Sequence, residues 1–210
     1  MQLADGDRGL WDDCVSRSSD AQVYHQWEWG DVLCKSYNFN RYYVAVKRGL
    51  DVIGILPVIL IRSSIFGDKF ISLPFCEYGG PLVVNPSDHS VEKYALTLLL
   101  KSLIQLRQTL KLDYIELRHP SGTLSPLLSS LGFRTLQRYL TFKINLARSE
   151  SELWQNLKRD VRRRVMKAMK AGVEVKDGGA NYLKEYYEMY LDTQKEHGSP
   201  PHSYDFFKNM

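Results

Sequence analysis

Helical periodicity dominates two segments in the first part of the chain. After Asp20, a suitable N-cap residue, apolar residues recur at three- and four-residue spacing as far as Tyr37, which predicts a helix over residues 20–37. Residues 90–110 show the same periodicity over a longer stretch, with leucines on one side and charged residues on the other. This pattern predicts a long amphipathic helix that covers one face of a sheet. A shorter helix is predicted over residues 124–131.

Strand patterns lie between these helices. Residues 41–47 and 52–61 are apolar and β-branched and flank turn-forming residues, so they predict a β-hairpin. Pro57 has no N–H to donate to a ladder, and we therefore expect the second strand to be bulged, or at a sheet edge, near its middle. Further strands are predicted over residues 66–73, 114–118 and 133–146. Because strands and helices alternate along the chain, the predicted fold class is α/β.

After Arg148 the sequence predicts mainly helices. Residues 149–152 read Ser-Glu-Ser-Glu, a capping box that predicts a helix running to about residue 171. A short strand (173–176), a helix (181–197) and the first turn of another helix from Ser203 are predicted to follow. We place a domain boundary near Ala147, which gives a first domain over residues 1–146 and the beginning of a second over residues 147–210.

A compact domain rarely stops in the first turn of a helix. The sequence therefore predicts that the chain is either a truncated form or completes its core with a partner, such as a second copy of itself.

Composition and cysteine usage narrow the class of protein. With 44% apolar and 25% charged residues among 210, a folded protein is expected. The N-terminus lacks the basic start and apolar stretch of a secretory signal, and the most apolar run, residues 52–61, is about half as long as a spanning helix. Three widely spaced cysteines predict reduced thiols and no zinc site. We expect a cytoplasmic protein with no bound metal and no membrane span.

A net charge of +4 says little about chemistry, but its distribution is uneven. Seven basic residues are crowded into one predicted helix: Lys158, Arg159, Arg162, Arg163, Arg164, Lys167 and Lys170. Arg159, Arg163, Lys167 and Lys170 fall on one side of it. Guanidinium groups bind phosphates bidentately, so this strip is a candidate site for a nucleotide-linked precursor or for tRNA. The simpler interpretation is a solvated charged face of an amphipathic helix.

Several short motifs occur in a characteristic order and spacing over nearly the whole chain. They are Tyr24-His25-Gln26-Trp27-Glu28-Trp29, Gly54-Ile55-Leu56-Pro57, Ser72-Leu73-Pro74-Phe75, Tyr78-Gly79-Gly80-Pro81-Leu82, Glu152-Leu153-Trp154 and the basic run from Arg162 to Val173. Together they resemble the first half of FemAB-like proteins. The run from Pro74 to Gly80 is most similar to the subgroup linked to exopolysaccharide and exosortase gene clusters.

This resemblance implies two tandem domains of the GCN5-related N-acetyltransferase fold, a mixed sheet flanked by helices, the second domain only begun here. Family members with known roles take amino acids from aminoacyl-tRNA and add them to the peptide of cell-wall precursors. Members usually continue for a complete second domain, where the resemblance places most of the donor site. The resemblance therefore implies that the chain alone lacks much of an active site.

Two further places are candidate substrate-binding sites. Tyr78, Gly79 and Gly80 form a hinged loop in which glycine lets a substrate approach the backbone, although paired glycines also serve simply to turn a chain. Arg118 ends a predicted strand, where α/β folds often bind ligands. Glu77, beside the loop, could orient an amine. Cys76 is better explained as a small buried residue than as a nucleophile, and no catalytic triad is recognisable.

The sequence thus leads to three hypotheses for function. The first is an acyl- or aminoacyl-transferase that transfers an activated group to an amine in cell-wall or surface-polysaccharide synthesis. The second is a coenzyme A-dependent N-acetyltransferase, although the Gln/Arg-x-x-Gly-x-Gly/Ala loop that grips the pyrophosphate is missing after residues 66–73 and 114–118. The third is a module that binds RNA or another polyanion without chemistry. For the two enzymatic hypotheses, aminoacyl-tRNA or acyl-coenzyme A would be a donor substrate, not a bound cofactor.

Overall fold

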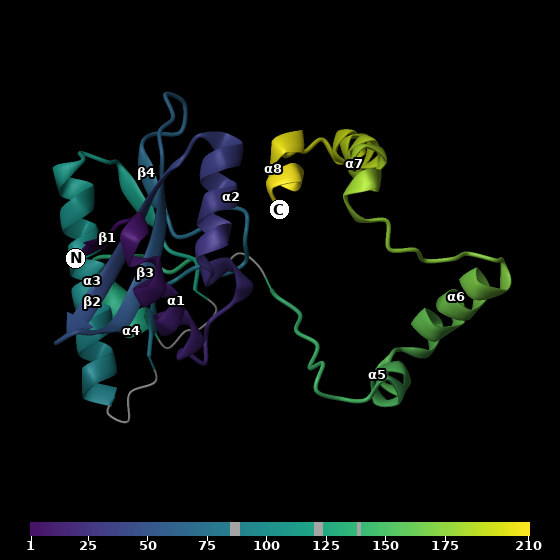
Figure 1. Ribbon diagram of the computed structural model, residues 1–210, viewed down its shortest axis with the longest axis horizontal. Coiled ribbons are helices and arrows are strands. Elements are labelled where there is room, and N and C mark those ends of the chain that lie inside the picture. Colours follow the sequence, from purple (N-terminus) through teal and green to yellow (C-terminus); the bar gives the residue numbers. More distant parts are fainter. Residues whose placement is uncertain (85–88, 120–123, 138–139) are drawn as a thin grey trace. The chain divides into compact units, whose positions relative to one another are not determined.

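The computed structural model describes residues 1–84, 89–119, 124–137 and 140–210, which divide into two compact units (Figure 1). Unit 1 comprises Met1–Leu136 together with Pro200–Met210, and unit 2 comprises Gln137–Ser199. The division into a first and a second domain near Ala147 stays a prediction. No helix within the described ranges is both long and apolar enough to cross a membrane.

Unit 1 contains a mixed sheet. Its strands are β1 (Gln2–Leu3), β2 (Asn40–Arg48), β3 (Asp51–Ile61), β4 (Lys69–Ile71), β5 (Leu82–Val83) and β6 (Tyr114–Glu116). They pair in the order β1-β2-β3-β4-β6, with β5 also pairing with β3. The β4–β6 pair is parallel and the others are antiparallel. The predicted α/β class with a mixed sheet flanked by helices is confirmed.

Pro57 lies where β3 changes partners. On one side it is paired with Tyr43 of β2. On the other side β5 pairs with β3 at Gly54 and Ile55, and β4 pairs with it from Ile59 onwards. Pro57 therefore falls between the two ladders, where a missing N–H costs no hydrogen bond. The expected sheet edge near the middle of this strand is present among the described residues.

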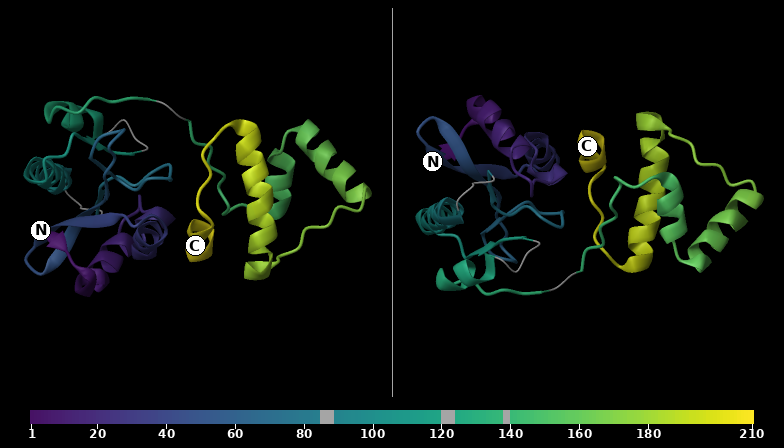
Figure 2. Two further views of the ribbon diagram at one scale, coloured as in Figure 1. Left: turned by 90° about the horizontal axis from the view of Figure 1, so that it is seen from above. Right: turned by 90° about the horizontal axis from the view of Figure 1, so that it is seen from below.

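Helices cover both faces of the sheet (Figure 2). Helix α3 (His89–Thr109) packs on one face, and α1 (Arg8–Ser16) and α2 (Trp27–Tyr37) pack on the other. Because successive side chains of a strand point to opposite faces, Val44 and Leu56 contact the α3 side while Tyr43 and Ile55 contact the α1 and α2 side. Short helices η1 (Asp5–Asp7), η2 (Val23–His25) and α4 (Ser125–Ser130) complete this part of the unit.

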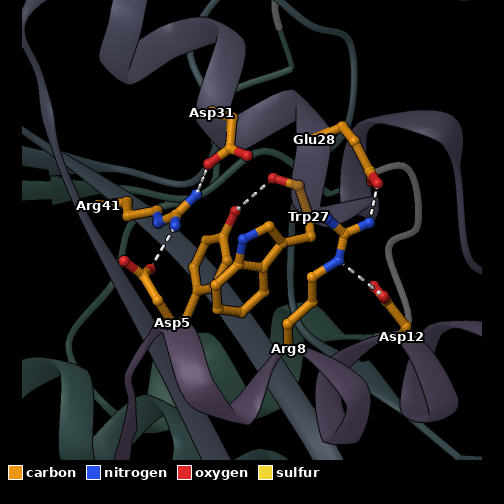
Figure 3. Close-up of polar contacts among 8 residues, drawn as sticks. Asp5, Arg8, Asp12, Trp27, Glu28, Asp31 and Arg41 are labelled. Carbon is orange, nitrogen blue, oxygen red and sulfur yellow. Dashed lines mark hydrogen bonds and ion pairs between the residues drawn. The ribbon is translucent and has the colours of Figure 1, made fainter.

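An aromatic cluster fixes α1 and α2 to β2. The ring of Tyr43 stacks on Trp11 with centroids 4.1 Å apart and meets the edge of Trp27 at 4.6 Å. The guanidinium of Arg41 lies 4.5 Å above the Trp27 ring and pairs with Asp31 and Asp5 (Figure 3).

A second guanidinium, that of Arg8, joins Asp12 of α1 to Glu28 of α2 in the same view. These ion pairs lie at the rim of a buried aromatic core, so they orient the two helices and contribute modest stability.

The C-terminal helix α8 (Tyr204–Asn209) packs on α2. Phe206 is buried there. The Ser36 hydroxyl donates to the carbonyl of Asp205 at 3.3 Å, and the Tyr37 hydroxyl lies 2.6 Å from Nδ1 of His202. The helix predicted from Ser203 is present, and the structure groups it with unit 1.

Unit 2 consists of α5 (Glu150–Asn156), α6 (Arg159–Lys170), η4 (Gly179–Tyr182) and α7 (Leu183–His197). The capping box is confirmed, since Ser149 Oγ accepts from the N–H of Glu152 and the Glu152 carboxylate accepts from the N–H of Ser149. The single helix predicted over residues 149–171 is wrong, because extended backbone at Leu157 and Lys158 separates α5 from α6. Asp160 in the first turn of α6 favours a new helix start there, since an acidic residue complements the helix dipole.

Several predicted elements are shorter or absent. The helix expected from residue 20 begins as η2 and continues as α2 from Trp27, and the strand expected over residues 66–73 is limited to β4. Residues 173–176 and the described parts of 133–146 form no strand, because a strand pattern gains its hydrogen bonds only beside a partner. Residues 138 and 139 of the strand predicted over residues 133–146 lie outside the described residues.

Candidate functional site

A loop between β4 and β5, residues 73–81, is anchored to the end of β6. We call it the glycine loop. The Ser72 hydroxyl accepts from the N–H of Arg118 at 2.8 Å, and the N–H of Gly79 donates to the carbonyl of Arg118 at 3.1 Å. These bonds tie Ser72, just before the loop, and Gly79, within it, to Arg118, two residues after the end of β6. The loop and the end of β6 therefore form one connected surface.

The paired glycines are required by space rather than only by turning. A Cβ on Gly79 would lie 2.6 Å from Cβ of Leu73 and 2.8 Å from the carbonyl oxygen of Ser72. A Cβ on Gly80 would lie 2.9 Å from Cδ2 of His119 and 3.1 Å from the carbonyl oxygen of Arg118. The backbone at Gly79 thus packs on Ser72 and Leu73, and the backbone at Gly80 packs on the residues that follow β6, which is the close approach that glycine permits.

His25 contacts the backbone of the glycine loop from the protein interior. It is buried, its Nδ1 accepts from the N–H of Gln22 at 3.1 Å, and its Nε2 lies 3.1 Å from the carbonyl oxygen of Gly80. Because Nδ1 is an acceptor, the neutral ring carries its proton on Nε2 and donates it to Gly80. Burial lowers the pKa of His25 and keeps the ring neutral. The indole N–H of Trp11 in turn donates to the His25 carbonyl at 2.7 Å.

Arg118 presents a guanidinium group at this surface. Its Nε donates to the carboxylate of Glu116 at 2.9 Å and its Nη1 to the carbonyl of Cys76 at 3.1 Å. Within the described ranges no bond of this side chain uses Nη2, and the side chain is 31% exposed. The two bonds orient the guanidinium before any ligand binds. Because the side chain is partly exposed, the group can bind an anionic oxygen with little further loss of side-chain freedom.

Glu77 and Tyr24 form a polar pair at the exposed side of the loop. The Tyr24 hydroxyl donates to the Glu77 carboxylate at 2.6 Å. This bond lowers the pKa of Glu77 and raises the pKa of Tyr24 to about 12. Glu77 is therefore ionised near neutral pH, which suits it to hold an ammonium group and makes it a weak base.

Leu73 and Phe75 strain the backbone of the glycine loop. Both adopt left-handed conformations, with φ of 55° and 64°, which non-glycine residues rarely adopt. Phe75 packs against Tyr37 and His202, with ring centroids 5.1 Å and 4.6 Å away. Such strain persists only where surrounding contacts determine it, and it gathers at functional sites.

Cys76 does not supply a nucleophile. Burial raises the pKa of its thiol to about 12, despite the opposing influence of Arg118. The Sγ atom lies 2.9 Å from the carbonyl of Leu73 and 3.0 Å from that of Tyr78. The thiol stays protonated and helps to close the loop, in agreement with the interpretation of Cys76 as a small buried residue.

Alkaline pH is expected to destabilise the protein through its buried thiols. In the folded state the pKa values are about 12 for Cys76 and about 11 for Cys14, against 9.0 for an unperturbed thiol. Between these values the unfolded chain releases protons that the folded chain retains, so stability falls as pH rises above about 9, by about 1.4 kcal/mol per pH unit for each thiol. Urea titrations at about pH 8 and about pH 10 measure the fall. The Cys76→Ala variant should show a shallower slope, and rapid labelling of both folded thiols at neutral pH would contradict the expectation.

The basic residues predicted for substrate binding lie on a different unit. Arg163 and Arg164 of α6 both pair with Asp160, and their side chains are 80% and 79% exposed. Arg159 and Lys167 are exposed on the same helix. Tyr78, Gly79, Gly80 and Arg118 thus come together in unit 1, whereas Arg159, Arg163 and Lys167 belong to unit 2.

No partner for His25 and no role for Ser72 or Tyr24 could be predicted from the sequence. Their hydrogen-bond partners lie far along the chain, Gly80 for His25 and Glu77 for Tyr24. The local sequence therefore marked these two residues only through the motif Tyr24–Trp29, which contains both. Within the described residues, His, Cys, Asp and Glu side chains form no cluster of three that could hold a metal ion. A shallow groove beside Lys47, Arg48 and Tyr94 contains none of the predicted site residues.

Comparison with known proteins identifies a family for part of the chain. The FemAB family model matches residues 128–210. The crystal structure of FemX superposes on the whole chain with a TM-score of 0.67 at 19% sequence identity. Residues 128–210 are thus similar to the FemAB family. The chain spans 53% of the length of FemX, and at this identity the likeness describes the fold of the chain and not its activity.

Other solved structures share a looser similarity. An acetyltransferase of Trypanosoma brucei is 13% identical, with a TM-score of 0.48 over 69% of this chain and 97% of its own. A ribosomal-protein-alanine N-acetyltransferase of Brucella melitensis is 10% identical, with a TM-score of 0.47 over 69% of this chain and 98% of its own. No curated protein sequence matches the chain significantly.

Proposed function

We propose that the chain carries the acceptor-binding part of a FemAB-type acyl- or aminoacyl-transferase that acts in cell-wall or surface-polysaccharide synthesis. The observation that carries this proposal is the position of Arg118, whose guanidinium is fixed beside the glycine loop. In that loop, Gly79 and Gly80 leave no room for a side chain larger than hydrogen. The match of residues 128–210 to the FemAB family supports it. The motif from Pro74 to Gly80 favours the exopolysaccharide-linked subgroup.

Transfer of an acyl group to an amine requires little covalent chemistry from the protein. A neutral amine attacks the carbonyl carbon of an activated ester or thioester, and the new C–N bond forms. The C–O or C–S bond to the leaving group then breaks, and the proton that the amine loses passes to the leaving oxygen or sulfur. Positioning of the two substrates and stabilisation of the oxyanion supply most of the rate. A protonated Cys76 is consistent with direct attack, and Glu77 orients the amine before it loses its proton.

The two substrates would meet different parts of the protein. Arg118 and the glycine loop hold an anionic group of a nucleotide-linked acceptor, through the guanidinium and close backbone contact. Arg159, Arg163 and Lys167 hold the phosphates of the donor, which is aminoacyl-tRNA or an acyl-coenzyme A. The exposure of α6 fits a polyanion equally well, so a module that binds RNA without chemistry is the second candidate.

The Arg118→Lys variant is expected to bind a nucleotide-linked cell-wall precursor at least about tenfold more weakly. Lysine keeps the charge, but its single nitrogen cannot reproduce the planar fork with which arginine reaches Glu116, the carbonyl of Cys76 and a ligand from separate nitrogen atoms. Titration calorimetry of the full chain with the precursor measures the change. Unaltered affinity would overturn the assignment of Arg118 to the acceptor site.

Arg17→Lys is the matched control for this experiment. Arg17 also bonds one carboxylate, that of Asp13 at 2.7 Å, and one backbone carbonyl, that of Val52 at 3.1 Å. Neither partner belongs to the glycine loop or to β6. Its replacement should leave precursor binding unchanged. If loss of Arg159, Arg163 and Lys167 instead weakens every anionic ligand alike, and Arg118→Lys weakens none, the polyanion-binding module is favoured.

A further inference from the structure

The loop between β3 and β4 carries two exposed apolar side chains near its middle. Ile65 is 81% exposed and Phe66 is 70% exposed, and Figure 1 shows this loop projecting beyond the sheet. We call these two residues the apolar tip. Among the described residues of unit 1, no other neighbouring pair of large apolar side chains is more than half exposed. Single exposed apolar residues are ordinary, but an adjacent pair on a protruding loop calls for an explanation.

The loop holds the apolar tip outward through its own hydrogen bonds. The Ser63 hydroxyl accepts from the N–H of Phe66 at 3.0 Å, and the Asp68 carboxylate accepts from the N–H of Ser63 at 3.1 Å and pairs with Arg62. Gly67 adopts a φ of +75°. These bonds fix the turn, so the apolar side chains are presented to solvent by a braced loop and not by a loose one.

A second set of bonds joins the loop to the start of β6. The Asp113 carboxylate accepts from the N–H of Asp68 at 2.7 Å, and the N–H of Asp113 donates to the carbonyl of Asp68 at 2.8 Å. A Cβ on Gly67 would lie 2.6 Å from Oδ2 of Asp113. Both carboxylates are therefore used inside this structure, and they bind backbone groups and Arg62.

The side chains around the apolar tip are of the kinds that occupy membrane interfaces. Lys69 Nζ donates to the Tyr114 hydroxyl at 2.7 Å and lies 5.8 Å from the Phe66 ring. Arg62 and Lys111 are exposed at the same end of the sheet. Tyrosine, lysine and arginine place an apolar body near lipid chains and a polar end among headgroups.

We propose that the apolar tip docks unit 1 on the surface of a membrane that contains anionic lipid. A protein partner of ordinary affinity would need a contact of about 800 Å² on each side, whereas two side chains on a protrusion suffice to enter the boundary between headgroups and acyl chains. The basic rim of Arg62, Lys69 and Lys111 attracts the phosphates of anionic lipids. The proposal is independent of the proposed enzymatic function.

Insertion is measured with a Phe66→Trp variant of the full chain and vesicles of phosphatidylcholine and phosphatidylglycerol with brominated acyl chains. The extra tryptophan fluorescence, taken as the difference from the unmodified protein, is expected to be quenched. Leu50→Trp is the matched control, because Leu50 is 93% exposed at the turn of another hairpin, between β2 and β3. Its extra fluorescence should not be quenched.

Removal of the apolar tip tests the energetic part of the proposal. The double variant Ile65→Ser, Phe66→Ser should bind the same vesicles about tenfold more weakly or worse, and its melting temperature should be unchanged because the side chains are exposed. Lys111→Gln should weaken binding only where phosphatidylglycerol is present. The basic helix α6 could also attract anionic vesicles. Sedimentation with vesicles while the tryptophan at position 66 stays unquenched, or undiminished binding by the double variant, would overturn the proposal.

Discussion

The Gly30→Ala variant is expected to lose about 2 kcal/mol of unfolding free energy. A Cβ at this position would overlap the hydroxyl oxygen of Tyr43 and lie 3.0 Å from its Cζ. The ring is 2% exposed and is held between Trp11 and Trp27, so it cannot withdraw without moving both. Overpacking of this kind costs up to about 3 kcal/mol, and the gain of about 1 kcal/mol from alanine in a helix offsets part of it. Urea denaturation measures the difference.

Two controls isolate the steric cause. Gly9→Ala places alanine in α1 where a Cβ meets nothing within 4 Å, and it should stabilise the protein by up to about 1 kcal/mol. Tyr43→Phe removes the overlapping oxygen and only a long hydrogen bond, 3.4 Å to the carbonyl of Trp27. Combined with Gly30→Ala, it should recover most of the lost stability. A Gly30→Ala protein as stable as the parent would show that the Tyr43 ring is free to move.

Replacing His25 is expected to weaken acceptor binding and to cost about 1–3 kcal/mol of stability, because one or both of its buried partners lose a hydrogen bond. Two variants separate its nitrogen atoms. In His25→Gln the amide can still donate to the carbonyl of Gly80, and in His25→Asn the side chain can still accept from Gln22. If His25 positions the glycine loop, precursor binding falls further in His25→Asn at similar stability. Binding losses that follow stability alone in both variants would assign His25 a purely structural role.

The pH dependence gives an independent readout of the same residue. The folded-state pKa of His25 is lowered by burial, so below about 6.5 the unfolded chain takes up a proton that the folded chain resists. Stability contributed by neutral His25 is present above that pH and is lost as pH falls. The His25→Gln variant should show a shallower loss of stability between about pH 7 and about pH 5.

The β2–β3 hairpin and α3 could be predicted because their side chains alternate with a period set by the local backbone. The same pattern misled over residues 133–146. Leu140, Phe142, Ile144 and Leu146 alternate with polar residues, but each is more than 70% exposed and the described residues around them form no strand. A strand needs a neighbouring ladder as well as a suitable sequence. Likewise, α5 and α6 were merged because apolar spacing alone did not reveal the extended residues between them.

The residues of the candidate site likewise fall into those with a local signal in the sequence and those without one. Tyr78, Gly79, Gly80 and Arg118 were predicted as site residues from turn chemistry and from the position of Arg118 at a strand end, which are local signals. His25, Ser72 and Tyr24 were not assigned, because their hydrogen bonds join segments that only folding brings together. The crowded basic residues of α6 were visible in the sequence, but their relation to the glycine loop depends on the arrangement of two units.

By itself the sequence determined the α/β class, the central hairpin and the amphipathic helix on the sheet. Those properties follow from side-chain periodicity and backbone preference, which act over a few residues. Only the tertiary structure decided that His25 and Arg118 hold the glycine loop, that Gly30 makes room for Tyr43, and that Ile65 and Phe66 stay outside the core. Those outcomes depend on which distant groups come within hydrogen-bonding or packing distance, and such distances exist only once the chain has folded.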